Sequence, residues 1–418
     1  LRRFPMCCRR RKCVCNTSEV VRQGLTSQKP PQGENVMIPQ AERPRIKPIY
    51  PVYRLNSKVF RIGAQLGITV EFDDPEGEMW NLVSLLDGRP LAAVLDAMTT
   101  KFPHLTPQDV IEGVELLDRE GVLEETLPLP SSSANNRYLP NINYFSRFIG
   151  LNGSRFDTQQ RINDASILLL GAGGGGSNIL SLLGGMGPKQ LKIVDYDRVE
   201  EGNLGRQLLY REPDVGRKKV EVAAEALGAM NSAINVEAID AKIIDSDDVI
   251  PLLEGVDIAI CAIDEPPFLI QRVVNKAIVE KNVPCVFGAS QVSRGRIFTV
   301  IPRRTGCFDC LNIHYAKNDP QYLEQFRAFA QISFAPPSMA YGPSIYSLSA
   351  LIVDEAVRVL TGYAPARSLG TQYEVNFEDG TSFCHPSWPR YDAECPTCGN
   401  GDERENPLFQ HFSIIASQ

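Results

Sequence analysis

The stretch SILLLGAGGGGSN, residues 166–178, decides the fold class of this chain. It begins as a continuous apolar run and breaks into glycines that open a pattern of helical period. Such a run is typical of a strand buried on both faces. Glycine is needed where the chain turns tightly and where a phosphate approaches the backbone N–H groups of a helix N-terminus. The stretch predicts a strand, turn and helix that bind a nucleotide, but it does not separate a dinucleotide site from a mononucleotide site.

Apolar runs of the same kind recur further along the sequence. They lie at residues 191–194, 256–263 and 283–287, and helical patterns separate them. Buried strands that alternate with helices indicate a parallel sheet covered on both faces. We therefore predict an α/β fold with a Rossmann-like, doubly wound, largely parallel sheet.

The strand after the glycines runs into IVDYDRVEEGNLGRQ, residues 193–207. An acidic residue about 20 positions beyond such glycines is placed to bind ribose hydroxyls. Dehydrogenases, however, have no reason to continue with Asn, Arg and Gln at this spacing. The string resembles the DxDxVxxxNLxRQ signature of the ThiF/MoeB/HesA adenylating family. Residues 216–220, GRKKV, resemble the GxxKV helix start of that family, and residues 257–264 resemble its DxxDN segment, with Glu265 in place of Asn.

The resemblance implies an activity and a set of site residues. The family transfers AMP from ATP to a carboxylate, giving an acyl-adenylate and pyrophosphate, with Mg²⁺ beside the phosphates. Its first Asp holds ribose, its Asn, Arg and Lys hold phosphates, and its last Asp takes part in binding magnesium. The expected ATP-binding residues are Gly171, Gly173, Gly174, Gly176, Ser177, Asp195, Asp197, Asn203, Arg206, Gln207, Lys219 and Asp264. The expected catalytic residues are Arg206, Lys219, Asp264 and Arg147.

Arg147 is assigned from a partial match. In the family, an arginine in an RYxRQ stretch upstream of the glycines reaches into the ATP site of the neighbouring protomer. Here residues 144–148 are YFSRF, so the first Arg and the Gln of that stretch are missing. If Arg147 has this role, the active unit is a homodimer.

Two CxxC pairs, CFDC at 307–310 and CPTC at 395–398, predict a metal site. Four thiolates suit a tetrahedral, structural Zn²⁺ with no position left for water. The resemblance supports this, because the family has a four-cysteine zinc at these places; the expected ligands are Cys307, Cys310, Cys395 and Cys398. A redox pair is the alternative. Residues 311–350 contain no cysteine, which favours adenylation without an enzyme thioester and leaves Cys384 as a remaining candidate.

The N-terminal part has a different pattern. Alternation over residues 52–62 and 69–72 predicts a hairpin, and helical periods follow at 79–86, 91–102 and 106–120 before a short strand. This order is a winged-helix arrangement, a small α+β domain. Residues 53–125 resemble a PqqD-type peptide-recognition domain, a family that binds the leader of a ribosomally made peptide as an added strand. A scaffold that only packs or dimerises is the alternative.

These patterns suggest four segments. Residues 1–46 are expected to be a disordered or wrongly assigned N-terminal tail, 47–127 the PqqD-like domain, 128–142 a linker, and 143–418 the adenylation domain. A net charge of -7 argues against nucleic-acid and anionic-membrane partners, which need a basic face. No signal-peptide pattern is visible, so a cytoplasmic protein is expected.

Three functions follow from this combination. The first is adenylation of a carboxylate on a ribosomally made precursor peptide, recognised by the N-terminal domain, in natural-product biosynthesis. The second is adenylation of the C-terminus of a ubiquitin-like sulfur-carrier protein. The third is a non-catalytic protein that binds a leader peptide for another enzyme. Retention of Asp195, Arg206, Lys219 and Asp264 argues against the third, because a pure binder has no use for a phosphate and metal site.

Overall fold

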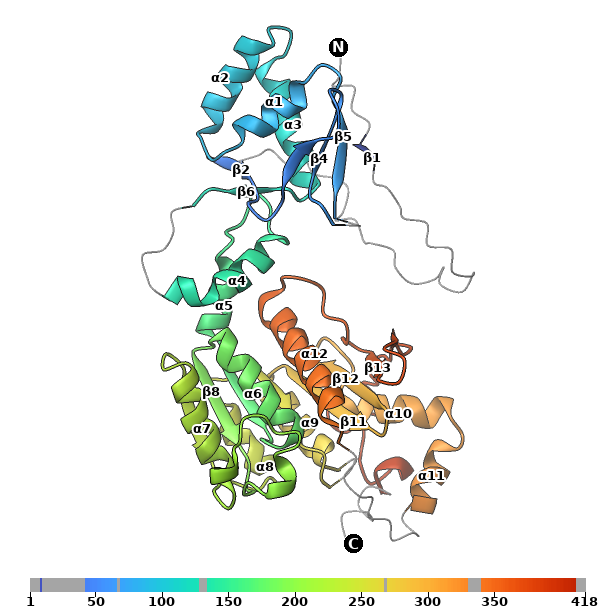
Figure 1. Ribbon diagram of the computed structural model, residues 1–418. Coiled ribbons are helices and arrows are strands. Elements are labelled where there is room, and N and C mark those ends of the chain that lie inside the picture. The colour runs from blue at the N-terminus through green and yellow to red at the C-terminus, as the bar shows by residue number, and fades with distance from the viewer. Residues whose placement is uncertain are drawn as a thin grey trace. The chain divides into compact units, whose positions relative to one another are not determined.

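The computed structural model describes residues 8–9, 42–65, 68–127, 134–266, 269–329 and 340–410. The chain divides into two compact units, residues 1–159 and 160–418 (Figure 1). Each unit is described separately below.

The first unit has the predicted hairpin and helices. Strands β3 (Val52–Arg54), β4 (Val59–Ile62) and β5 (Val70–Asp73) form an antiparallel sheet, and β1 (Cys8–Arg9) pairs with β5. A second ladder joins β2 (Pro44–Ile46) to β6 (Leu123–Glu125). The helices of this unit are α1 (Glu78–Leu85), α2 (Leu91–Lys101), α3 (Pro107–Arg119) and α4 (Ala134–Ser146).

Local chemistry explains why α3 starts where the sequence predicts. The hydroxyl of Thr106 accepts from the backbone N–H of Asp109, and the Asp109 carboxylate accepts in return from the N–H of Thr106. This capping box, with Pro107 at the first helical position, satisfies N–H groups that have no partner within the helix. The buried face of α3 then packs into a core that includes the stacked rings of Phe60 and Phe72.

A buried polar network holds residues 143–155 against the rest of this unit. Arg155 donates to Glu124 at 3.0 Å and also to Asn143. The ammonium of Lys47, which is fully buried, donates at 2.7 Å to the carbonyl of Gly121 and at 3.3 Å to that of Arg147. Burial lowers the pKa of Lys47 to about 8, against the opposing charges of Glu124 and Asp118.

The second unit is built on an eight-stranded sheet in the order β14-β13-β12-β11-β10-β7-β8-β9. Strands β9, β8, β7, β10 and β11 are parallel, and β12, β13 and β14 continue the sheet antiparallel. The strands are β7 (Ser166–Leu170), β8 (Gln190–Val194), β9 (Asn235–Ile239), β10 (Ile258–Cys261), β11 (Cys285–Gln291), β12 (Arg294–Val300), β13 (Gln372–Asn376) and β14 (Ser382–Cys384). The predicted α/β fold with a largely parallel sheet is confirmed.

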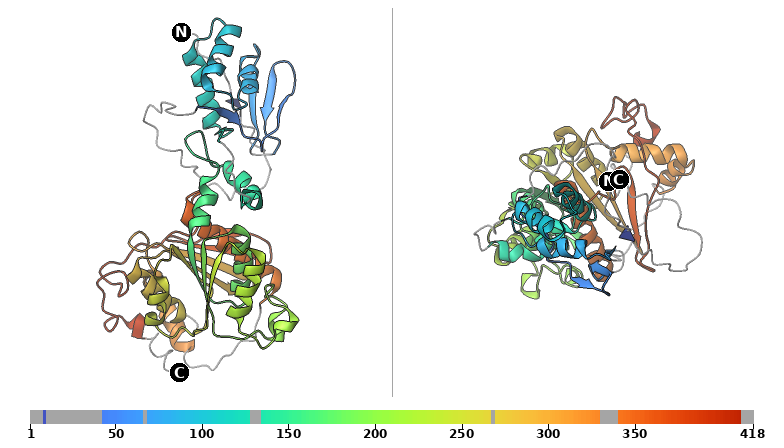
Figure 2. Two further views of the ribbon diagram at one scale, coloured as in Figure 1. Left: turned by 90° about the vertical axis from the view of Figure 1, so that its left-hand side faces the viewer. Right: turned by 90° about the horizontal axis from the view of Figure 1, so that it is seen from above.

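Helices cover both faces of this sheet (Figures 1 and 2). On one face α6 packs against α12 and α7, and on the other α9 packs against β10, α8 and α10. The helices of this unit are α6 (Gly174–Met186), α7 (Lys219–Met230), α8 (Ser246–Val249), α9 (Leu269–Lys281), α10 (Phe308–Asn318), α11 (Tyr322–Phe329) and α12 (Gly342–Thr361), and the division between the two units falls within α5 (Asp157–Asp164). Short 3-10 turns lie at η1 (Glu201–Asn203), η2 (Glu212–Asp214) and η3 (Ile250–Leu253).

Some expected segments lie partly outside the described residues. Residues 1–7 and 10–41 of the expected tail and residues 128–133 of the expected linker are among them. Within the described part, residues 44–46 form β2, and α4 begins inside the expected linker, at Ala134. The segment boundaries proposed from the sequence remain predictions. Of the helices in the described ranges, none has the length and hydropathy that crossing a bilayer would require.

Candidate functional site

A cavity of about 650 Å³ opens at the carboxyl ends of the parallel strands. This is the edge at which open α/β sheets bind ligands. Predicted site residues that line it are Gly171, Gly173, Gly174, Asp195, Asp197, Asn203, Arg206, Gln207, Lys219 and Asp264. Residues from four separate stretches of sequence therefore meet in one place.

The glycine turn between β7 and α6 is too tight for side chains. Gly171 has a φ of 95°, and a Cβ there would lie 2.8 Å from the carbonyl oxygen of Ala262. A Cβ at Gly176 would lie 1.8 Å from the carbonyl oxygen of Gly171. Gly176 and Ser177 are buried under the turn and are not among the described residues that line the cavity. Gly176 and Ser177 therefore allow the chain to turn, whereas Gly173 and Gly174 line the cavity.

Two side chains from outside the predicted set hold the carbonyls of this turn. The Asn178 amide donates to the carbonyl of Gly174 at 2.6 Å and to that of Arg206 at 3.0 Å. The hydroxyl of Ser349, on α12, donates to the carbonyl of Gly175 at 3.2 Å. Asn178 thus ties the glycine turn to the segment that contains Arg206. A Cβ at Gly174 would lie 3.4 Å from Nε of Arg206, so the arginine lies directly over the turn.

The carboxylates after β8 are organised by short hydrogen bonds. Asp195 accepts from the backbone N–H of Ala172 at 2.7 Å and from that of Asp197 at 2.8 Å. The buried ammonium of Lys219 donates to Asp197 at 2.8 Å. These contacts join the end of β8 to the glycine turn and to the start of α7.

Tyr210 supports the same turn from beneath. Its hydroxyl donates to the carbonyl of Ala172 at 2.7 Å. Burial, with a further contribution from Asp195, raises the pKa of Tyr210 well above its usual 10. The phenol therefore remains a neutral hydrogen-bond donor at any physiological pH.

Asp264 and Glu265 follow strand β10 and line the cavity beyond the end of that strand. Both are exposed and line it, so the Glu that replaces the family's Asn adds a second carboxylate at this position. Carboxylate oxygens are the ligands that Mg²⁺ prefers, and it is held through one or two of them together with substrate phosphates. Asp264 and Asp197 are thus suitable donors for a magnesium ion on a bound nucleotide.

The sequence reasoning missed two other parts of the lining. Tyr196 and Lys242 lie at the β8 and β9 ends, with the Lys242 ammonium 5.2 Å from the centre of the Tyr196 ring. The opposite wall consists of residues 288–292 and the α12 residues Ile345, Leu348 and Ile352. Lys242 could have been suspected, because it follows the strand next to β8. The β11 and α12 wall depends on long-range packing that leaves no local signal.

Arg147 belongs to the first unit. It follows α4, it is exposed, and its guanidinium lies 5.6 Å from the centre of the Phe148 ring. The role assigned to it from the family resemblance remains a prediction.

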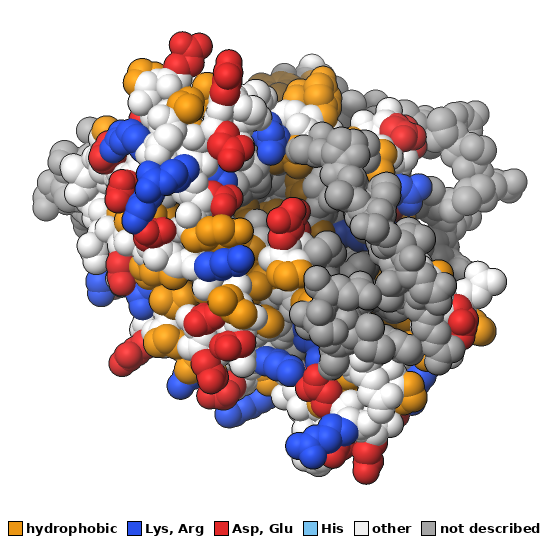
Figure 3. Space-filling model, turned by 90° about the horizontal axis from the view of Figure 1, so that it is seen from below, with side chains coloured by type: hydrophobic (Ala, Val, Ile, Leu, Met, Phe, Trp, Pro, Cys, Tyr) orange, Lys and Arg blue, Asp and Glu red, His pale blue; other side chains and the backbone are white. Residues whose placement is uncertain are grey.

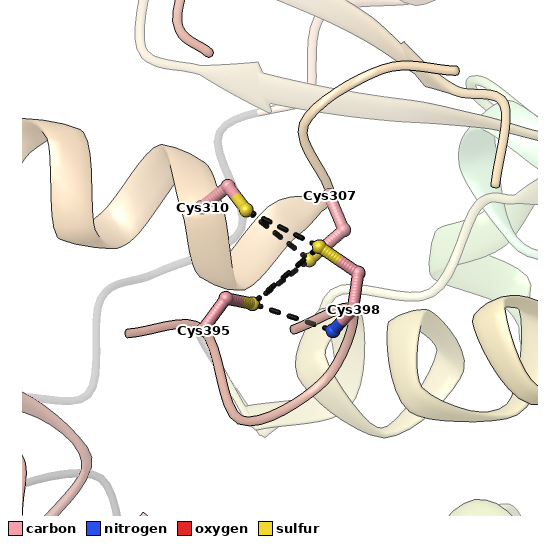
Figure 4. Close-up of side chains that lie close together, drawn as sticks. All are labelled: Cys307, Cys310, Cys395 and Cys398. Carbon is pink, nitrogen blue, oxygen red and sulfur yellow. Dashed lines mark hydrogen bonds between the residues drawn. The ribbon is translucent and has the colours of Figure 1, made fainter. Parts of the chain in front are cut away.

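The four cysteines predicted to bind zinc converge (Figure 4). Their ligand atoms all lie within 4.8 Å of one another. The separations between Sγ atoms are 3.9 Å for Cys307–Cys310, 3.5 Å for Cys307–Cys395, 3.3 Å for Cys310–Cys398 and 3.7 Å for Cys395–Cys398. Tetrahedral Zn–S bonds of about 2.3 Å require sulfurs roughly 3.8 Å apart, so the cluster fits Zn²⁺.

The remaining cysteines of the second unit lie elsewhere. Cys261 and Cys285 are buried in adjacent strands, where burial raises the pKa of each thiol, that of Cys261 to about 12. Cys384 is exposed on β14, and partial desolvation of its thiol together with the negative charge of Glu355 raises the pKa of that thiol. A raised pKa leaves less thiolate at neutral pH, so none of the three is activated as a nucleophile.

Figure 3 shows the molecule from below. On the described part of this face, acidic and basic side chains are interspersed with hydrophobic ones, and neither charge forms a continuous patch.

Comparison with known proteins matches more than half of the chain to one family. A model of the ThiF family matches residues 139–397. The chain is 28% identical over 234 residues to a molybdopterin-synthase adenylyltransferase of Salmonella typhimurium, covering 55% of this chain and 87% of that protein. It is 30% identical over 251 residues to a sulfur carrier protein adenylyltransferase of Thermus thermophilus, covering 58% and 85%.

Solved structures share the fold over more of the chain. The microcin C7 biosynthetic enzyme MccB in complex with N-formylated MccA superposes with a TM-score of 0.66 at 20% identity, covering 85% of this chain and 99% of that one. A structure of E. coli MccB with ATP gives a TM-score of 0.67 at 21% identity, with coverage of 85% and 99%. The likeness therefore extends beyond the stretch matched by the family model.

Proposed function

Because this chain belongs to the ThiF family and is an ATP-dependent adenylyltransferase, we propose that it activates a carboxylate of a ribosomally made precursor peptide. The observation that carries this proposal is the fold shared with MccB, whose solved complexes contain ATP or MccA and cover 85% of this chain. The product is a modified peptide natural product of the antibiotic type.

The reaction forms one bond and breaks one. A carboxylate oxygen of the peptide attacks the α-phosphorus of ATP, the bond to the oxygen that bridges to the β-phosphorus breaks, and that oxygen leaves with the electron pair as part of pyrophosphate. The peptide retains AMP as a mixed anhydride, and no proton transfer is required. Catalysis is therefore a matter of positioning and of charge neutralisation.

We assign the neutralisation to Arg206 and Lys219. Arg206 lies over the glycine turn, and the Lys219 ammonium lies 2.8 Å from Asp197. Asp195 is assigned to the ribose hydroxyls, and Asp197 with Asp264 to a magnesium ion. Magnesium supplies the positive charge that offsets repulsion between the carboxylate and the polyphosphate.

We further propose that the first unit binds the leader of the precursor peptide and that the active unit is a homodimer, with Arg147 contacting the partner's nucleotide. The hairpin and three helices of the first unit support the former, because that arrangement offers a strand edge. We place the reaction in the cytoplasm, where ATP is available and the four cysteines stay reduced.

A second candidate substrate is the C-terminus of a ubiquitin-like sulfur carrier. The identity of 30% to a sulfur carrier protein adenylyltransferase favours it. Both substrates would present a carboxylate on a polypeptide, so the same cavity would serve either.

ATP–pyrophosphate exchange in the presence of magnesium tests these alternatives. Precursor peptides encoded beside the gene and a ubiquitin-like sulfur carrier are assayed in parallel. Exchange with a precursor peptide alone is expected, and Lys219→Ala should abolish it. Exchange with the carrier alone would replace the peptide proposal, and exchange with neither would contradict both.

A further inference from the structure

A buried ion pair joins the four-cysteine cluster to helix α9. Asp309 lies between Cys307 and Cys310 in the first CxxC pair, and its carboxylate is fully buried. Nε of Arg272, on α9, donates to the two carboxylate oxygens of Asp309 at 2.9 and 3.1 Å. The hydroxyl of Thr397, in the second CxxC pair, donates to the same carboxylate at 2.6 Å. Asp309 therefore connects both halves of the cluster to one helix outside it.

The same face of α9 makes further contacts with this region. The side-chain oxygen of Asn275 accepts from the backbone N–H of Phe308 at 2.9 Å. Arg272 also donates to Glu403 at 2.6 Å, and its guanidinium lies 4.4 Å from the centre of the Phe409 ring. Buried ion pairs add little net stability, but they restrict geometry, because moving either ion leaves a buried charge without its partner. Arg272 is buried, so its contacts fix where α9 lies against the cluster.

The first turn of α9 borders the nucleotide cavity. Ile270, the second residue of α9, is buried and lines the cavity. Its N–H donates to the carbonyl of Pro266 at 3.1 Å, and Pro266 lines the cavity two residues after Asp264. Arg272 follows Ile270 by two residues on the same helix. The start of α9 is therefore held to the segment that contains Asp264 and, within the same turn, to the cysteine cluster.

Resting on the adenylation function proposed above, in which Asp264 takes part in binding magnesium, we propose that Arg272 and Asp309 are positioning residues for the magnesium–ATP complex. They hold the first turn of α9, and through it the Pro266 segment, so that the Asp264 carboxylate reaches a magnesium ion on the phosphates. Neither Arg272 nor Asp309 is among the described residues that line the cavity, so both act through the backbone of α9. The cysteine cluster then contributes to the nucleotide site as well as to the stability of the fold.

The role of the pair is separable from metal binding. Four thiolates already satisfy a tetrahedral Zn²⁺, so the Asp309 carboxylate is not needed as a ligand. Asp309→Asn keeps the size of the side chain and one acceptor oxygen, but it removes the charge that pairs with Arg272. Because all four thiolates remain in this variant, it should keep its zinc.

Titration calorimetry of the full chain with ATP, with and without magnesium, tests the proposal. The wild type is expected to bind ATP more tightly when magnesium is present. Asp309→Asn should weaken binding about five- to tenfold with magnesium and less than about twofold without it, because the residues assigned to the phosphates are unchanged. A pair that only stabilises the fold would lower the melting temperature and leave both dissociation constants unchanged. Metal analysis accompanies each titration, and no chelator is added.

A second variant and a matched control accompany Asp309→Asn. Thr397→Val keeps both ions but removes the hydroxyl that orients Asp309, and it should weaken magnesium–ATP binding about two- to threefold. Lys317→Ala removes an exposed ion pair with Glu394, which joins α10 to the region of the second CxxC pair without involving α9. This control should bind magnesium–ATP like the wild type.

Several results would overturn the proposal. One is that zinc-loaded Asp309→Asn and Thr397→Val both bind magnesium–ATP like the wild type. Another is an equal loss of affinity with and without magnesium, since that indicates a general distortion of the cavity. Loss of zinc from both variants would make the pair part of the metal site and would also overturn it. If magnesium does not strengthen ATP binding by the wild type, the assignment of Asp264 fails and this inference with it, whereas a wild type that binds no ATP would contradict the adenylation function itself.

Discussion

Asn178 shows how a single buried amide can organise a phosphate site. Its Nδ2 group is the shared donor for the carbonyls of Gly174 and Arg206, so it fixes the distance between the glycine turn and the arginine segment. This role of Asn178 could not be predicted from the sequence, because an Asn early in a helix is usually only a polar residue near the helix cap. Asn178 acts as a positioning residue for Arg206.

We predict that Asn178→Ala weakens ATP binding about five- to tenfold, or about 1 kcal/mol or slightly more, because the variant loses the two hydrogen bonds that hold the glycine turn to the arginine segment. Asn178→Asp should weaken it further, because a carboxylate would face two carbonyl oxygens. Titration calorimetry with magnesium and ATP measures the dissociation constant. Ser181→Ala, which removes a hydroxyl from the same helix, is the control and should bind ATP normally. Equal affinity for all variants would show that Asn178 has no role in positioning.

Lys47 leads to a pH dependence of stability. Its pKa in the folded protein is about 8 against an ordinary 10.5, because burial penalises the charged form. Below pH about 8 the folded protein must carry the buried positive charge of Lys47. Between pH about 8 and about 10.5 the Lys47 ammonium has lost its proton in the folded protein but keeps it in the unfolded chain. Stability relative to a Lys47→Met variant should therefore rise over that window, by about 3 kcal/mol at most.

Urea unfolding measures this. The chain has two tryptophans, Trp80 in the first unit and Trp388 in the second. In a Trp388→Phe background, the fluorescence of Trp80 reports the unit that contains Lys47. The difference in unfolding free energy between the protein that keeps Lys47 and the Lys47→Met variant should change with pH. A constant difference from about pH 7 to 10.5 would refute the predicted pKa.

At the scale of elements, the predictions from sequence succeeded where the determinant is local. The β7 strand, the glycine turn and α6 follow one another in the sequence, and the capping residues of α3 are adjacent to the helix that they start. The antiparallel strands β13 and β14 were not predicted. β13 pairs with β12, which lies about 80 residues earlier in the chain, and β14 pairs in turn with β13; no short pattern specifies such a distant partner.

The contact between β11 and α12 gives a prediction for paired elements. Gly288→Ala places a methyl 2.2 Å from Cδ1 of Ile352 and should cost about 1–3 kcal/mol of unfolding free energy. Ile352→Val removes that Cδ1 atom, so the double variant should be more stable than the sum of the two single changes implies. Urea unfolding followed by Trp388 fluorescence in a Trp80→Phe background gives the four free energies. Strict additivity would mean that the backbone relaxes and that the crowding is not specific.

At the scale of the whole molecule, the four-cysteine cluster predicts one zinc ion per chain. Removing it with a chelator, or by Cys395→Ser, should lower the melting temperature of the second unit by about 10 °C, because a structural metal contributes several kcal/mol to folding. The fluorescence of Trp388 reports the unfolding of the second unit. The fluorescence of Trp80 reports the first unit, whose transition should be unchanged. Cys384→Ser, outside the cluster, is the matched control. Metal analysis that finds no zinc in the wild-type protein or in the Cys384→Ser control would contradict the assignment.

The spacing of the two cysteine pairs has an evolutionary consequence. Cys307 and Cys395 are 88 residues apart, and the chain between them contains α12, one wall of the cavity. When both ends of a segment are fastened at one point, insertions and deletions in its loops need not disturb the parallel strands beside the nucleotide cavity, since lengthening a loop costs little. New acyl specificities can therefore arise by rewriting this enclosed segment while the chemistry stays the same.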